Sequence, residues 1–194
     1  MAYLIVGLVL FIGVHSVSIV GRAWRDRMTE KYGTFAWRGV YGLLSLAGLV
    51  LIVHGYALAR LAPVIVYAPP LWTRGITVPL MVFVFPLLFS AYLPGIISTM
   101  AKHPLLVAVK LWATLHLLVN GSLADILLFG SLLAWAVVVR ISIKRHPRPP
   151  VRTAPPSKWN DAIAIVAGFA VYAAMIMGGH QWLIGVPALL PRVH

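Results

Sequence analysis

The chain has 194 residues, of which 61% are hydrophobic and only 10% are charged, and a soluble domain could not solvate that composition. It has no cysteine, which excludes disulfides, thiolate metal sites, iron–sulfur clusters and a cysteine nucleophile. Its formal charge of +12 would suggest nucleic acid in a soluble protein, but here it indicates basic loops at an anionic membrane surface. We therefore predict an all-α, polytopic integral membrane bundle, one domain over residues 1–194, in contact with lipids and not with nucleic acid.

Six apolar stretches predict about six transmembrane helices. They cover residues 2–20, 36–61, 76–97, 104–118, 123–139 and 162–177, and QWLIGVPALL is a candidate extension of the last. The first is interpreted as a retained helix, because no positive charge precedes it and no small-residue cleavage site follows. Pro79, Pro86 and Pro94 predict kinks in the third, which neighbouring helices can accommodate.

The connections between these stretches are polar or rich in proline. A charged loop is predicted over 21–36, and the prolines of APVIVYAPPLWTRG, residues 62–75, predict an extended segment. Asn120 and Gly121 predict a tight turn. A basic, proline-rich inner loop is expected over about 140–160, because this stretch is too polar to span a membrane.

Basic residues are distributed unevenly between the two predicted sides. Three, Arg60, Arg74 and Arg192, fall on one side, and Lys110 falls within a span. The other side holds twelve: Arg22, Arg25, Arg27, Lys31, Arg38, Lys102, Arg140, Lys144, Arg145, Arg148, Arg152 and Lys158. The positive-inside rule then predicts a multi-pass protein of the bacterial cytoplasmic membrane, with both termini outside the cytoplasm.

Histidines are the main candidates for chemistry. His146 and His194 fall in polar segments, and His180 is expected at the outer interface beside Trp182. The remaining four lie within or at the start of apolar spans: His15, His54, His103 and His116. An ionisable group buried in lipid is costly and marks a candidate site. The alternative is a neutral imidazole bonded to a neighbouring helix.

Several intramembrane histidines without cysteine, and with almost no acid, favour haem over other cofactors. Asp125 is the only acid outside the basic inner loops and their edges, and it can cap a helix. Hard cations need carboxylates, and zinc hydrolysis needs three ligands and a general base. Two facing histidines in a helical bundle instead suit haem iron.

The stretch HPLLVAVKLWATLHLLVNGSLADILLFG, with LFIGVHSVSI and WRGVYGLLSLAGLVLI before it, resembles the NnrU family of membrane proteins. The family is linked to nitrogen-oxide respiration, through the expression or function of nitrite and nitric oxide reductases. It is also similar to 15-cis-zeta-carotene isomerase, a plastid membrane enzyme that holds haem b through histidines. The resemblance implies His15 and His116 as axial ligands, with Trp112 and His103 in the cofactor-binding motif.

Two observations bear on this assignment of ligand residues from the resemblance. The isomerase has a cysteine where this chain has Ala113, so a cysteine-for-histidine ligand exchange is impossible here. His116 lies ~18 Å from the inner end of its span, whereas His15 lies only about 6–8 Å from the inner end of its own. His54 is better matched in depth and is kept as the alternative partner of His116.

Three functions remain open from the sequence. The first is a haem b protein of the NnrU family, acting as an accessory or nitric-oxide- and redox-responsive factor beside reductase subunits. The second is a haem-dependent cis–trans isomerase of a lipophilic, carotenoid-like polyene, and the third is a membrane scaffold without haem.

Overall fold

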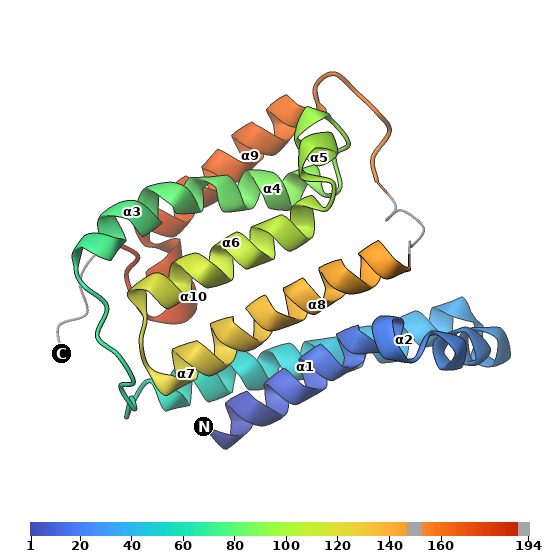
Figure 1. Cartoon of the computed structure of the whole chain (residues 1–194), viewed down its shortest axis with the longest axis horizontal. Helices are drawn as coiled ribbons and strands as arrows, with labels where there is room; N and C mark the ends of the chain where they lie inside the picture. The colour runs from blue at the N-terminus through green and yellow to red at the C-terminus, as the bar shows by residue number, and fades with distance from the viewer. Residues whose placement is uncertain (147–152, 190–194) are drawn as a thin grey trace.

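The computed structural model describes residues 1–146 and 153–189, and over these residues every regular element is a helix or a helical turn (Figure 1). In chain order they are α1 (Ala2–Val20), α2 (Arg22–Ala59), α3 (Trp72–Leu80), the 3-10 turn η1 (Met81–Phe83), α4 (Val84–Ser90), α5 (Ile96–Ala101), α6 (Pro104–Val119), α7 (Leu123–Asp125), the π-helical turn η2 (Ile126–Gly130), α8 (Ser131–Arg145), α9 (Asn160–Ala174), the π-helical turn η3 (Met175–Gly179) and α10 (His180–Ile184). The expected all-α fold is confirmed.

Four helical runs of the described chain are long and apolar enough to cross a membrane: Thr34–Ala59, Trp72–Ser90, Leu123–Arg145 and Asn160–Ile184. A fifth span results if the segments Ala2–Val17 and Arg22–Tyr32, bent by 81°, are counted together. α6 is apolar but has only 16 residues, which is about 24 Å of helix against a hydrocarbon core of about 30 Å. The chain is therefore a polytopic membrane protein with four or five candidate spans, and the count of six is not confirmed.

Several boundaries differ from the sequence expectations. The charged segment after α1 is helical from Arg22, and the chain bends at Gly33, whose φ of 84° favours glycine. The third run begins at Trp72 and ends at Ser90, so Pro94 lies beyond it. α8 continues through Arg145, because basic residues stabilise the last turn of a helix. The first part of the expected inner loop is therefore helical, and residues 147–152 of it lie outside the described residues.

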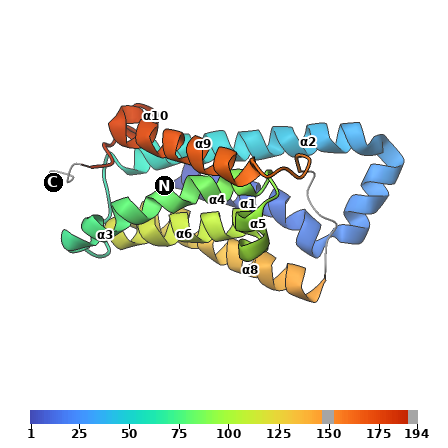
Figure 2. The same ribbon diagram turned by 90° about the horizontal axis from the view of Figure 1, so that it is seen from above.

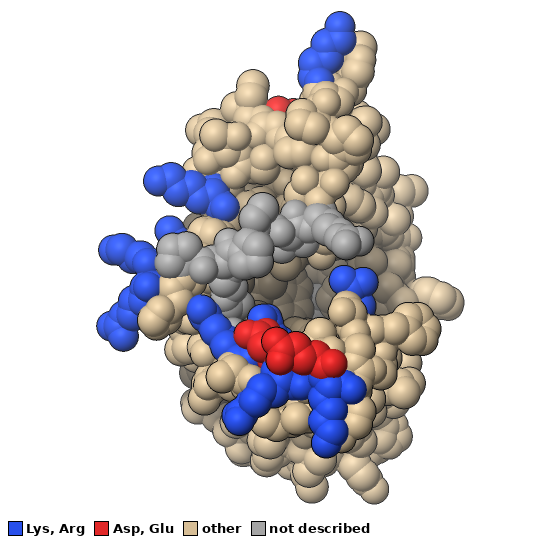
Figure 3. Space-filling view, turned by 90° about the vertical axis from the view of Figure 1, so that its right-hand side faces the viewer, with Lys and Arg blue, Asp and Glu red and all other residues tan. Residues whose placement is uncertain are grey.

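The long helices run side by side along one axis, with the connections at the two ends (Figures 1 and 2). Met1, the end of α2, the end of α6 and α10 share one end of the bundle. The other end holds the bend between α1 and α2, α5 and the end of α8. Lysine and arginine side chains gather on that second end, with a small group of acids among them (Figure 3). The fold thus brings to one end many of the described lysine and arginine residues that the sequence distributes over three connections.

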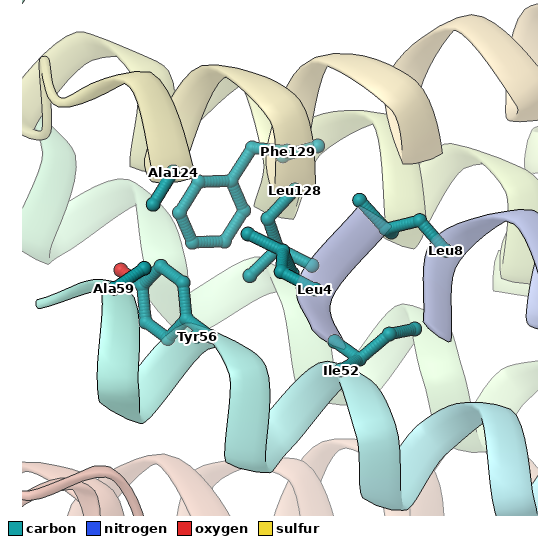
Figure 4. Packing of buried hydrophobic residues seen from close by; sticks show 9 residues of the cluster. Leu4, Leu8, Ile52, Tyr56, Ala59, Ala124, Leu128 and Phe129 are labelled. Carbon is teal, nitrogen blue, oxygen red and sulfur yellow. The ribbon is translucent and has the colours of Figure 1, made fainter. Parts of the chain in front are cut away.

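The core lies where α1, α2 and α6 meet the run from α7 into α8. Leu4, Ile52, Tyr56 and Phe129 are buried together there, and the rings of Tyr56 and Phe129 point toward one another (Figure 4). Large apolar side chains remain exposed elsewhere, including Val9, Leu43 and Val166, which are 69%, 70% and 68% exposed. Exposed apolar surface on this scale is typical of helices that face lipid.

Candidate functional site

His116 lies in the last turn of α6, within a cage of aromatic rings. Its Nδ1–H donates to the carbonyl oxygen of Trp112 at 2.8 Å, one helical turn earlier. Its ring stacks on Phe129 with centroids 4.5 Å apart and planes 25° apart, and the ring of Trp112 is 4.9 Å away. The structure therefore brings together His116 and Trp112, two of the residues that the resemblance names.

His180, the first residue of α10, is the second imidazole at this place. Its ring centroid lies 6.5 Å from that of His116, with the planes 21° apart. Its Nδ1–H donates to the carbonyl oxygen of Val186 at 2.5 Å. Among the described residues, the Nε2 atoms of both imidazoles have no hydrogen-bond partner. Both rings thus present Nε2, the nitrogen that remains available to ligate a metal.

A buried carboxylate, that of Asp125, lies just after the turn that follows α6. The side chain of Asp125 is fully buried and accepts from the hydroxyl of Tyr56 at 2.5 Å. It also accepts from the amide and the hydroxyl of Ser122, at 3.0 and 2.6 Å, and so closes a capping box at the start of α7. Asp125 caps a helix, as expected, and it also ties α2 to α7 through Tyr56.

His15 lies on α1 in a separate aromatic environment. Its Nδ1–H donates to the carbonyl oxygen of Phe11 at 2.7 Å, and its ring contacts Phe11, Tyr41 and Trp135. Tyr41 also lines an open cavity of about 200 Å³ whose wall includes Arg25 and Arg38. His15 therefore belongs to the basic half of the bundle, whereas His116 belongs to the opposite half.

The positions of His15 and His116 can be compared along one helix. Phe129 contacts His116 and Trp135 contacts His15, and both belong to the continuous run from η2 into α8. The two aromatic positions are six residues apart, which is about 9 Å along the axis and about a third of a turn around it. The structure does not bring His15 and His116 into ring contact.

The other two predicted site residues also lie apart from His116. His54 is exposed on α2, and its ring contacts Tyr3 edge-on at 5.7 Å. His103 precedes Pro104 at the start of α6, near the basic end. Burial lowers the pKa of His103, and the nearby charges of Arg140 and Lys110 lower it further. A neutral His103 at a helix start is consistent with a structural role.

This arrangement limits the chemistry that the site can perform. In the described part of the chain, no group of three or more histidine, cysteine or acidic side chains could hold a metal ion. What the described residues offer is one imidazole pair, His116 and His180, with each ring oriented by a backbone carbonyl. A ligating histidine commonly donates its second nitrogen to such a carbonyl, which fixes the tautomer and the direction of the ring. This donor set fits haem iron.

The fold and the site define a polytopic helical membrane protein with intramembrane imidazoles in aromatic cages. The model of the NnrU protein family matches residues 3–188, so this chain belongs to the NnrU family. Neither the comparison with curated proteins nor that with solved structures gives a match. The family is thus established over nearly the whole chain, while the similarity to the isomerase stays a prediction.

Reasoning from the sequence missed His180 as a neighbour of His116. Hydropathy alone places this residue at the outer interface beside Trp182, which is 84% exposed. The signal that could have indicated the inward turn is the pair Gly178 and Gly179 just before it. Gly178 has a φ of 135°, a backbone conformation that L side chains rarely adopt, and it breaks the regular course of the last helix.

Proposed function

We propose that this NnrU-family protein binds haem b through His116 and acts as an accessory factor of denitrification, responsive to nitric oxide or to redox state. The observation that carries the proposal is the environment of His116. Its Nδ1 is anchored on a backbone carbonyl, its Nε2 is available, and aromatic rings surround it. Haem iron, when bound, supplies nitric oxide binding and one-electron redox chemistry.

The roles of the surrounding residues follow from their contacts. Trp112 orients the imidazole by accepting its Nδ1–H, and Phe129 holds the ring plane by stacking on it. Asp125 fixes the turn between α6 and α7 through its bonds with Ser122. Together these contacts favour one direction of Nε2 before any ligand binds, which lowers the ordering cost of binding.

The position one turn before His116 argues against a reaction like that of the isomerase. Ala113 is fully buried there, and the chain has no cysteine at any position. A ligand exchange between a cysteine sulfur and imidazole therefore has no donor. Membrane reductase subunits remain the proposed partners of the accessory role.

The test is a visible spectrum of the protein purified from haem-replete cells. The wild type is expected to show a Soret band and, on reduction, a low-spin b-type spectrum that nitric oxide alters. His116→Ala is expected to lose most of the haem, while His54→Ala, which removes an exposed imidazole from another face, should retain it. A colourless wild type that also fails to take up added haemin would overturn the proposal, and a scaffold function would replace it.

A further inference from the structure

We propose that His180 is the second imidazole that would ligate haem iron at this site, together with His116. The inference rests on the proposed haem function and adds a residue that the family resemblance does not name. Of the histidines in the described chain, His180 is the one whose ring is recorded in contact with that of His116. His15 and His54 make their ring contacts with other side chains.

The spacing of the two rings suits a shared iron. An imidazole nitrogen lies about 2 Å from the metal that it ligates, so two imidazoles on opposite faces of one ion have ring centres about 6 Å apart. The observed separation is 6.5 Å, with planes only 21° apart. The ring contact with His180 therefore matches the spacing that a bis-imidazole iron needs.

Both imidazoles are held in the same way. Each donates Nδ1–H to a backbone carbonyl, His116 to Trp112 and His180 to Val186. The carbonyl of Ile184, the last residue of α10 and two residues before Val186, is also fixed, because the guanidinium of Arg60 donates to its oxygen. The segment that carries His180 is thus tied to α2, so the ring does not depend on α9 alone for its position.

Two π-helical turns, η2 and η3, position residues of the His116–His180 site. Phe129, which stacks on His116, lies in η2, and His180 directly follows η3. π-helical turns are rare in proteins and frequently mark functional sites. Each inserts one extra residue into a helix and so re-aims the side chains that follow. Two such turns lie next to one imidazole pair, whereas apolar helices can pack without any π-helical turn.

The experiment compares axial-ligand variants of the full-length protein by electronic and electron paramagnetic resonance spectra after haemin loading. His180→Gly is expected to convert the low-spin spectrum to a high-spin, five-coordinate one while His116 retains the haem. Added imidazole should restore the low-spin bands in His180→Gly, because it fills the space that the side chain left. His54→Gly, which removes an exposed imidazole, is the matched control and should keep the wild-type spectrum without added imidazole. His15→Gly tests the competing ligand that the resemblance names and is also expected to keep the wild-type spectrum.

The outcomes separate this inference from the proposed function. A low-spin wild type with an unchanged His180→Gly spectrum would overturn the role of His180 and leave the haem proposal intact. Conversion by His15→Gly instead would assign the second ligand to the residue that the family resemblance names. A wild type without haem would overturn both. If His180→Gly does not fold, His180→Met tests the same point, because a thioether ligand keeps six-coordination and raises the reduction potential.

Discussion

Asp125 shows how a single residue can be both a helix cap and a link between helices. Its carboxylate has no exposed surface and accepts from Tyr56 and Ser122. The sequence indicated the cap, because an acid at a helix start is a local feature. The bond to Tyr56 joins residues 69 positions apart, and no local pattern encodes such a pairing.

Asp125→Ala is expected to destabilise the protein by about 2–5 kcal/mol, because it leaves two buried hydroxyls and an amide without their acceptor. Tyr56→Phe should cost less, about 1.5–3 kcal/mol, since it removes one bond to the carboxylate. Because the two residues share one contact, the double variant should be less destabilised than the sum of the single variants. Thermal unfolding in detergent measures all three, and strict additivity would show that the contact contributes nothing.

His103 gives a prediction about pH. Burial lowers its pKa in the folded protein, and Arg140 and Lys110 lower it further. The unfolded chain then binds a proton more readily than the folded one, so acidification through the ordinary histidine range near 6.5 favours unfolding. The wild type is expected to lose stability as the pH falls from about 7.5 to about 5.5, and His103→Gln should lose less. Equal pH slopes for the two proteins would contradict this.

At the scale of elements, hydropathy predicted where the apolar helices lie but not which of their faces meet. The first stretch, 2–20, coincides with α1, because an unbroken apolar segment in lipid satisfies its backbone hydrogen bonds by forming a helix. His54 shows the limit of such reasoning. The expected depth of His54 in the membrane is similar to that of His116. His54 lies two residues before Tyr56, however, which is about 200° around α2. Because Tyr56 contacts Phe129, His54 faces away from Phe129 and contacts Tyr3 instead.

The hydropathy pattern of the sequence also does not predict the positions of the two π-helical turns. A turn closed by an i→i+5 bond holds an extra residue and rotates everything after it by about 100° relative to a regular helix. η3 produces that rotation just before His180. Its glycine pair marks a break, but only the packed bundle shows that the break turns the imidazole toward α6.

The pairing of α1 with α2 depends on glycines that allow close backbone approach. A Cβ on Gly7 would lie 2.6 Å from the backbone nitrogen of Ile52, whereas a Cβ on Gly13 in the same helix would meet no described atom within 4 Å. Gly7→Ala is expected to destabilise the protein by about 1–3 kcal/mol, because a backbone atom cannot move aside as a side chain can. Gly13→Ala should be neutral or stabilising by up to about 1 kcal/mol. Equal melting temperatures for the two variants would contradict this account of the packing.

At the scale of the whole molecule, the fold places the lysine and arginine residues unevenly between the two ends of the bundle. The bend after α1, the end of α8 and the start of α9 meet at one end of the bundle, and lysine and arginine gather there (Figure 3). Met1 and α10 lie at the opposite end. An arrangement of this kind satisfies the positive-inside rule only when the basic end faces the cytoplasm.

The topology can be tested with a pair of reporter fusions. A fusion that ends after Arg145, at the basic end, should place its reporter in the cytoplasm, where green fluorescent protein fluoresces and alkaline phosphatase is inactive. A fusion after His194 should give the reverse, because the helical run Asn160–Ile184 crosses back to the other side. Replacing Arg140, Lys144 and Arg145 with glutamine in the full-length fusion should shift part of the protein toward inverted or mixed signals, since short basic segments near helix ends set the orientation. Cytoplasmic activity of the His194 fusion would mean an odd number of crossings, and the short helix α6 would then be the first element to examine as one that does not span the membrane.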